Sequence, residues 1–363
     1  MNGVFDTGID EHDIGEVTLV ARGIATAVAP ETGLTDVQAE LLEAIAAALT
    51  GHRVDYRTLD PLGPAELADV LAARDLDYRQ RIVHHMVLGE LVLRPIPVVV
   101  AHRVAKYAEA LAIKDDFVRV ARRYAQGAYG LAWMDLERSG FVEHVREADG
   151  DAADAARLPS IAPPDDDPAL EARWQAFAQL PPDSLGYAVW DMYDSRGFAV
   201  PGAPGGAPPY LAQHDFVHVL ADYGTNLRGE VEVFALIGRA DPAPQGFAWL
   251  ATLVGLFETG YITTSGFFDR DVRDPVIQAP GMHLRVADAI RRGKTIWQRH
   301  CEDLFDFPYH QHAARPVDEV RAMLGVPPKS ATALEAGSAP LCSLDGMSET
   351  QRKVFTERRG GAG

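Results

Sequence analysis

Two histidines and two carboxylates lie in the middle of the chain at a spacing that suits a metal ion. The segment HDFVH runs from His214 through Asp215 to His218, and Glu230 follows after eleven further residues. Residues four apart on an α-helix lie on one face, about 6 Å from each other, so both imidazoles can point at a single ion. Two imidazoles and one or two carboxylates suit Zn²⁺, and they suit equally the two-histidine, one-carboxylate set of non-haem Fe²⁺.

The residues after the HDFVH segment predict a hairpin that returns Glu230 to the histidine pair. An apolar run over residues 216 to 220 is followed by Gly224, a residue type that favours the end of a helix. Gly229 and Glu230 then open the next element, and two helices joined by so short a loop would fold Glu230 back over both imidazoles. The following segment, VEVFALI, fits a strand as well as a helix by its periodicity.

Two histidines at this spacing are as often a capped or solvated pair as a metal site. A longer pattern is more specific: HDxxH, eleven residues and Glu, with LPPDSLGYAVWDMYDSRGF before it and DLFDFP and RPVDEVRAMLGV after it. This pattern resembles the ubiquinone (coenzyme Q) biosynthesis family whose members are numbered fourth in that pathway. The resemblance covers roughly residues 178 to 327, under half of the chain, and the metal motif is present without a substitution.

The resemblance implies a helical metal-binding domain with a role in making ubiquinone or a similar prenylated quinone. The implied reaction is loss of the ring C1 carboxylate of a prenylated hydroxybenzoate-type acid and its replacement by oxygen. His214, His218 and Glu230 would be ligands of one Zn²⁺ or Fe²⁺ ion. Asp215 would be either a fourth ligand or the carboxylate that orients a ligand histidine, and it is the candidate catalytic residue. The resemblance also implies a helix for VEVFALI.

Two alternatives remain open at this point. The first is a scaffold that binds a prenylated aromatic or isoprenoid lipid, holds a structural metal and organises other biosynthetic proteins; an added N-terminal module without visible chemistry favours it. The second is a zinc hydrolase. That class needs glutamate as general base directly after the first histidine, and this chain has the shorter Asp215. We therefore rank the hydrolase last.

Composition narrows the choice of partners and compartment. The formal net charge of −18 disfavours nucleic acid and anionic membrane surfaces as non-specific partners. The two cysteines are too few for a disulfide framework, and the sequence shows no signal-peptide pattern. We expect a cytoplasmic protein without a transmembrane segment, because no apolar run is long enough. Peripheral membrane contact and homo-oligomerisation stay open.

Helical patterns and composition divide the chain into two all-α domains with a linker between them. The first domain is a helical bundle that loosely resembles TerB-like tellurite-resistance modules in its helix pattern alone, and the second carries the metal motif. We expect, in order, a polar arm, the bundle, a linker rich in Ala, Asp and Pro, the metal-binding domain and a disordered tail, over residues 1–33, 34–145, 146–169, 170–328 and 329–363.

Five helices are expected in the bundle. Thr35 and Gln38 form a capping-box pattern that opens the first, and Gly51 ends it. The others are expected from about Pro64 to Leu71, from about residue 77 to 94, from Pro97 onward, and from about residue 115 to 133. The bundle also contains four isolated candidate ligands that lack a matching second set and that we interpret as ordinary structural side chains: His84, His85, Glu90 and His102.

The second domain is expected to be helical throughout. Ser184 caps a helix that Gly197 ends, and on that helix Trp190 and Tyr193 are interpreted as core or pocket wall. Residues 246 to 262 are apolar nearly all round, which indicates a buried helix or one wall of a lipid-sized cavity. Further helices are expected from Met282 to Arg292, ended by Gly293, and from Pro316 to Gly325.

Overall fold

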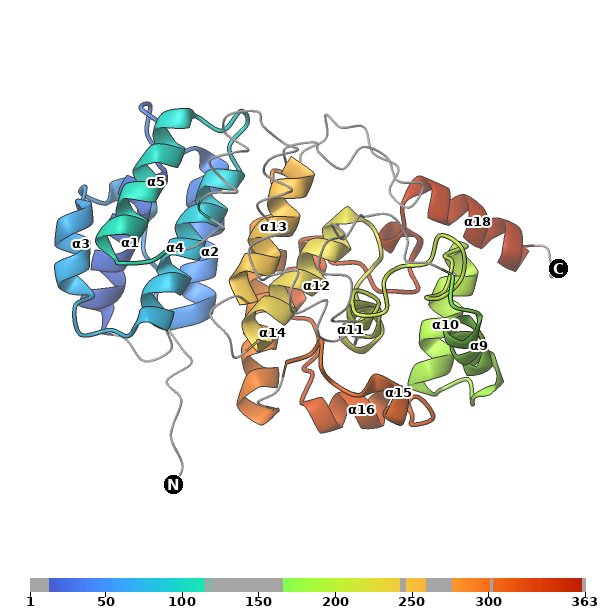
Figure 1. Cartoon of the computed structure of the whole chain (residues 1–363). Helices are drawn as coiled ribbons and strands as arrows, with labels where there is room; N and C mark the ends of the chain where they lie inside the picture. Colours follow the sequence, from blue (N-terminus) through green and yellow to red (C-terminus); the bar gives the residue numbers. More distant parts are fainter. Residues whose placement is uncertain are drawn as a thin grey trace, which may run out of the picture.

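The computed structural model of the chain describes residues 13–114, 118, 166–241, 246–258, 276–300 and 303–360. Every regular element in these ranges is a helix, and their one β-type pairing is a single bridge between Ser184 and Pro316. Figure 1 shows α1 to α5 at the left, α12, α13 and α14 in the centre, and α9, α10 and α18 at the right. The predicted all-α fold class is confirmed.

The N-terminal helices begin and end largely where their capping residues predict. Thr35 Oγ1 accepts a hydrogen bond from Gln38 N at 3.2 Å, the Gln38 side chain accepts one from Thr35 N, and Gly51 ends the helix at a φ of 75°. The elements are α1 (Ile14–Val28), α2 (Asp36–Thr50), η1 (Tyr56–Thr58), α3 (Pro64–Val70), α4 (Leu76–Leu91) and α5 (Val98–Ala110). The helix expected from about residue 115 and most of the expected linker lie outside the described residues.

Helix α1 corrects the expectation of a polar arm over residues 1–33. Asp13 caps it by accepting a hydrogen bond from Gly15 N at 3.1 Å. Its buried face carries Val17, Val20 and Ile24, which pack into the core. These residues have helical spacing, but the other buried positions of the helix are mostly alanine and glycine. Small residues lower the apparent periodicity of a helix that is nevertheless well buried.

The second half is also built of helices with recognisable caps. Ser184 accepts a hydrogen bond from Tyr187 N at 3.3 Å, and Gly197 ends the same helix at a φ of 73°, as predicted. The VEVFALI segment is helical. The elements are α9 (Pro168–Gln175), η2 (Ala176–Gln179), α10 (Leu185–Arg196), α11 (Gln213–Ala221), α12 (Leu227–Ala240), α13 (Gly246–Glu258), α14 (Met282–Arg299), α15 (Tyr309–His312), α16 (Val317–Leu324), α17 (Ala331–Glu335), η3 (Leu344–Gly346) and α18 (Glu349–Gly360).

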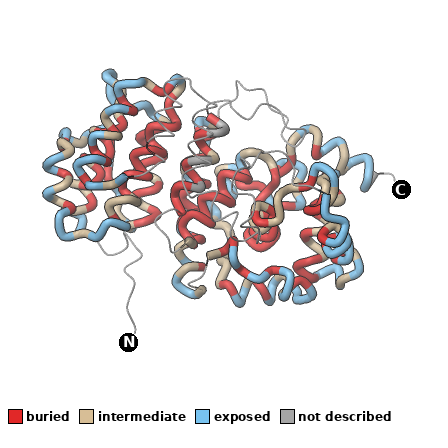
Figure 2. Tube along the Cα trace, in the orientation of Figure 1, coloured by how far each residue is buried: buried red, intermediate tan, exposed pale blue. Residues whose placement is uncertain are grey.

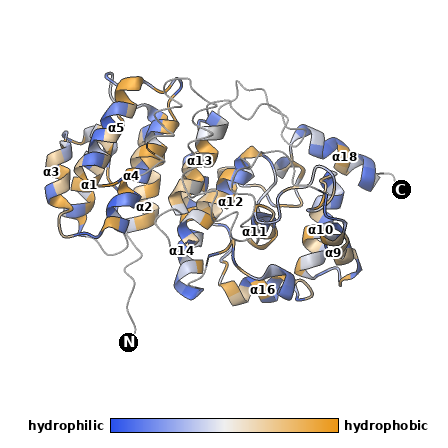
Figure 3. Ribbon diagram, viewed as in Figure 1, coloured by the Kyte–Doolittle hydropathy of each residue, from blue (hydrophilic) through white to orange (hydrophobic). Residues whose placement is uncertain are grey.

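The C-terminal segment is folded, which corrects the expectation of a disordered tail from residue 329. It contains α17, η3 and α18, and it buries Ala333, Leu341, Met347 and Gln351. Helix α18 is largely exposed (Figure 2) and mostly hydrophilic (Figure 3), so composition gives little sign of its packing. The segment is held largely by backbone groups and buried polar side chains, which hydropathy does not report.

Helix α14 continues to Arg299, so the expected stop at Gly293 is wrong. A Cβ atom at position 293 would lie 2.2 Å from the carbonyl oxygen of Leu236 on α12. Real Cβ atoms do not approach an oxygen so closely, so only glycine allows α12 and α14 to cross at this distance. The glycine marks a helix contact rather than a helix end.

Gly293→Ala should therefore lower the free energy of unfolding by about 1–3 kcal/mol, the usual range for an overpacked core. The measurement is denaturant unfolding, with Gln298→Ala on the exposed face of the same helix as control. An alanine variant as stable as the parent would show that the helices can separate here without loss.

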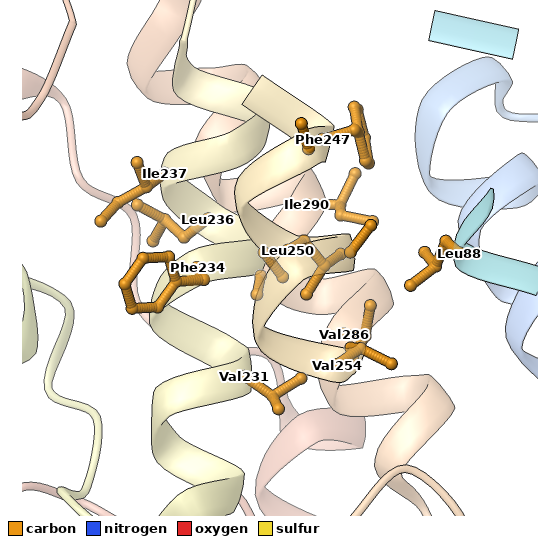
Figure 4. Close-up of a cluster of buried hydrophobic side chains, with 14 of the residues drawn as sticks. Leu88, Val231, Phe234, Leu236, Ile237, Phe247, Leu250, Val254, Val286 and Ile290 are labelled. Atoms are coloured by element: carbon orange, nitrogen blue, oxygen red, sulfur yellow. The ribbon is translucent and has the colours of Figure 1, made fainter. Parts of the chain in front are cut away.

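The buried apolar side chains form one contiguous cluster that includes both halves of the chain. Helix α14 packs along α2, and α13 packs against α4. Figure 4 shows Leu88 of α4 facing Val254 and Val286, beside Leu250 and Ile290. The division into two domains is therefore not confirmed. Among the described helices, none combines the length and apolar character needed to cross a membrane.

Candidate metal centre

Helix α11 presents His214 and His218 on one face, with their ring centroids 5.4 Å apart. The helix ends at Ala221 because Asp222 adopts a left-handed conformation with a φ of 58°. The end falls earlier than the predicted Gly224. Asp222 is of a residue type that tolerates this conformation better than most, because its short polar side chain can bond locally.

Helix α12 returns the chain to this face and completes the hairpin. Asn226 caps it by accepting a hydrogen bond from Gly229 N at 3.0 Å, and this start places Glu230 in the first turn. Glu230 Oε1 lies 3.2 Å from His218 Nε2, and its Oε2 lies 3.3 Å from His214 Nε2. The structure therefore brings together the three side chains that the sequence proposed as ligands.

The spacing of these atoms fits one small ion. The ligand atoms of His214, His218 and Glu230 all lie within 4.8 Å of one another, and theirs is the one such group found within the described ranges. Around a tetrahedral Zn²⁺ with bonds of about 2.1 Å, neighbouring ligand atoms are roughly 3.4 Å apart. Each histidine lies at about that separation from one oxygen of Glu230, His214 from Oε2 and His218 from Oε1. The group could therefore hold a metal ion.

The other ring nitrogens of both histidines are held by backbone carbonyls. His214 Nδ1 contacts the carbonyl oxygen of Leu211, and His218 Nδ1 lies 3.3 Å from that of Tyr223. A carbonyl oxygen accepts only, so each Nδ1 donates, and Nε2 is the ring atom of each histidine left to bind an ion once it carries no proton. The Nε2 atom of His218 is buried, with Glu230 Oε1 3.2 Å away. This arrangement is typical of histidines that bind a metal through Nε2.

Asp215 lies beside the three candidate ligands, but its carboxylate accepts a hydrogen bond from a different helix, α10. Its Oδ2 accepts a hydrogen bond of 2.5 Å from Tyr193 on α10, and its Oδ1 lies 3.6 Å from His214 Nε2. Tyr193, which the sequence placed in the core or a pocket wall, is buried and also contacts the site. The contact between Tyr193 and Asp215 could not be predicted from a local sequence pattern, because it depends on how α10 packs against α11.

Comparisons with protein-family models, with curated proteins and with solved structures return no match. The resemblance to the ubiquinone biosynthesis family therefore stays a prediction, and so does the identity of the ion.

His214 and Glu230 form a buried ion pair when no metal is bound. Burial lowers the pKa of His214, but the carboxylates of Asp215 and Glu230 outweigh it and raise that pKa to about 9. Burial raises the pKa of Glu230, but His218 and His214 outweigh it and lower that pKa to about 2. Burial, followed by the charge of Asp215, raises the pKa of Tyr193 well above its ordinary value, so its hydroxyl stays protonated.

The metal-free protein should lose stability in alkaline solution. The pKa of His214 is about 9 in the folded chain, against an ordinary value of 6.5 when the chain is unfolded. Its contribution is thus fully present below pH 6.5 and is lost as the pH rises through 9. Unfolding in the presence of a chelator, at a series of pH values between about 6 and 10, measures this loss. His214→Gln should remove most of the decline; an unchanged decline would place its cause elsewhere.

Two further histidines in the second half of the chain lie outside this centre. His310 packs its ring against Trp174 and Phe177, with centroids 5.5 and 5.3 Å away, and so belongs to an aromatic cluster. His283 Nδ1 lies 3.3 Å from Glu40 Oε2 on α2. Both histidines have structural contacts that account for them.

Proposed function

We propose that the chain is a metal-dependent enzyme that removes the ring carboxylate of an aromatic acid and replaces it by oxygen. The observation that carries the proposal is the convergence of His214, His218 and Glu230, whose ligand atoms all lie within 4.8 Å of one another. Three protein ligands leave further coordination positions for small molecules, which is the ligand set of non-haem iron oxygenases. The substrate class, a prenylated hydroxybenzoate-type acid, comes from the family resemblance.

The balanced reaction requires a reductant as well as dioxygen. The aromatic acid, one O₂, two electrons and two protons give the phenol, CO₂ and water. Fe²⁺ would supply the dioxygen chemistry, whereas Zn²⁺ could only polarise the carboxylate or hold a phenolate. The protein would hold the ion through its three ligands and keep Asp215 at the edge of the centre. The carboxylate of Asp215 is then available to accept or return a proton close to the ion.

Reconstitution of the metal-free protein with Fe²⁺ or Zn²⁺ tests this function. Each sample is incubated under ¹⁸O₂ with a prenylated hydroxybenzoate and ascorbate, and the product is analysed by mass spectrometry. We expect CO₂ release and one ¹⁸O atom per phenol with iron alone. His218→Ala should give neither product. Equal turnover with both metals, or none with iron that is demonstrably bound, would rule out the oxygenase function.

A scaffold with a structural metal is the second candidate, and one distance favours it. Asp215 Oδ1 lies 3.6 Å from His214 Nε2, close to the separation of neighbouring ligands around a tetrahedral ion. If Asp215 binds the ion, the site is a closed four-ligand centre without room for a substrate. The position of Asp215 therefore separates an open catalytic site from a closed structural one.

A further inference from the structure

The two candidate histidine ligands are oriented by carbonyl groups from different parts of the chain. His214 Nδ1 contacts the carbonyl oxygen of Leu211, three residues earlier in the turn that leads into α11. His218 Nδ1 instead lies 3.3 Å from the carbonyl oxygen of Tyr223, in the turn that follows the helix. The His218 side chain is fully buried, so bulk solvent does not reach it to replace this acceptor. The orientation of His218 therefore depends on what holds the turn after α11.

Two cations with buried side chains, from distant segments, bind that turn. Arg292 of α14 donates from Nη2 to the carbonyl oxygen of Ala221 at 2.9 Å, and its Cζ lies over the Tyr223 ring, 4.7 Å from the centroid. Lys329, between α16 and α17, donates to the carbonyl oxygen of Asp222, and its Nζ lies over the same ring, 5.5 Å from the centroid. Each cation thus holds both the backbone and the aromatic side chain of the turn.

Arg292 is itself fixed, and its contacts are shielded from water. Its Nε donates to the carbonyl oxygen of Pro327 at 3.0 Å, which sets the plane of the guanidinium. The Tyr223 ring below it is fully buried. A cation binds the face of an aromatic ring more tightly when both are desolvated, and a hydrogen bond from a charged donor is stronger than a neutral one. The position of the Tyr223 carbonyl is thus set from α14.

We propose that Arg292 is a positioning residue for the metal centre, acting through Tyr223 on His218. Its guanidinium holds the turn where the Tyr223 carbonyl can accept the Nδ1–H of His218, with His218 Nε2 toward Glu230. The inference rests on the proposed metal centre. It gives α14, which supplies none of the three candidate ligands, a part in metal affinity.

The test measures Zn²⁺ affinity by chelator competition in the full chain. Arg292→Met removes the cation, and the affinity should fall roughly 10- to 100-fold, the usual loss when a group that orients a ligand is removed. Arg321→Met is the matched control. Arg321 bonds the carbonyl groups of Val219 and Leu220 at the same helix end, but it is not one of the two cations over the Tyr223 ring. This control should lower stability and leave the Zn²⁺ affinity as in the wild type.

Two changes at position 223 test whether the aromatic ring is the group that Arg292 holds. Tyr223→Phe keeps the face of the ring and should retain wild-type Zn²⁺ affinity. Tyr223→Leu keeps the backbone carbonyl but removes the ring, so its affinity should fall roughly tenfold or more. The visible absorption of bound Co²⁺, which depends on ligand geometry, should change in Arg292→Met and Tyr223→Leu but not in Arg321→Met.

The results separate the metal centre from the role of Arg292. A wild type that binds neither Zn²⁺ nor Co²⁺ overturns the centre itself. Wild-type affinity in a folded Arg292→Met overturns only the positioning role. An equal loss in Arg321→Met also overturns it, because the effect would then be a general fraying of α11. If Arg292→Met does not fold, equal affinities in Tyr223→Phe and Tyr223→Leu would refute the proposal.

Discussion

Glu230→Gln should abolish tight metal binding while leaving the helical fold in place. The carboxylate faces both imidazoles, at 3.2 Å from His218 Nε2 and 3.3 Å from His214 Nε2. Glutamine has nearly the same shape, but it removes the negative charge and turns an NH₂ group toward one of these positions. Losing an outer-shell partner of a metal costs roughly 10- to 100-fold in affinity, and losing a direct ligand should exceed that.

Chelator competition with Zn²⁺ or Co²⁺ measures this affinity, and elemental analysis gives the stoichiometry. Glu319→Gln is the matched control, because that carboxylate lies on the exposed surface of α16. Circular dichroism confirms that the helices remain. Retention of one ion per chain at wild-type affinity in Glu230→Gln would falsify the assignment of Glu230 as a ligand. Glu230 and His214 would then be an ordinary buried ion pair.

The ligand spacing and most helix caps are local properties, and this is why they could be predicted. The geometry of His214 and His218 follows from the helical repeat, and Thr35 and Ser184 bond residues three positions along the chain. The hairpin that returns Glu230 depends on a short loop and was predicted for the same reason. Only the position at which α11 ends differed, since Asp222 rather than a glycine takes the left-handed conformation.

The rest of the centre depends on residues distant in sequence. The last carbonyl groups of α11 accept hydrogen bonds from three cationic side chains on separate segments. The donors and acceptors are Arg321 to Val219 and Leu220, Arg292 to Ala221, and Lys329 to Asp222. Cations at a helix C-terminus are favourable. No periodicity links these positions, so the pairs and the contact between Tyr193 and Asp215 could not be predicted.

The same reason explains the error about the C-terminal segment. Gly346 accepts backbone hydrogen bonds from Thr225 at 2.7 Å and Asn226 at 3.0 Å, in the loop between α11 and α12. A Cβ atom on Gly224 would lie 2.4 Å from the Cα atom of Gly346, so the two glycines allow direct backbone contact. A hydropathy pattern does not reveal such backbone contacts between glycines, so the packing of this segment could not be predicted from it.

Deletion of the chain from Ser338 onward should destabilise the protein and weaken metal binding together. The deletion removes the partners of Thr225 and Asn226, and it takes Leu341 O and Gln351 from the buried polar network of Arg196 and Thr225. Buried donors left without partners cost about 1–3 kcal/mol each. The affected loop also includes the Tyr223 carbonyl that orients His218, so the metal should bind at least tenfold more weakly.

Thermal unfolding with and without saturating Zn²⁺ separates the loss of stability from the loss of the site. A ligand that binds the folded state alone stabilises it in proportion to the logarithm of its concentration over Kd. The rise in melting temperature on adding Zn²⁺ should therefore be smaller for the truncated chain than for the full chain at equal metal concentration. Arg358→Ala is the control, because its ion pair with Asp194 is exposed and contributes little. An undiminished rise in the truncated chain would mean that the segment stabilises the fold without positioning His218.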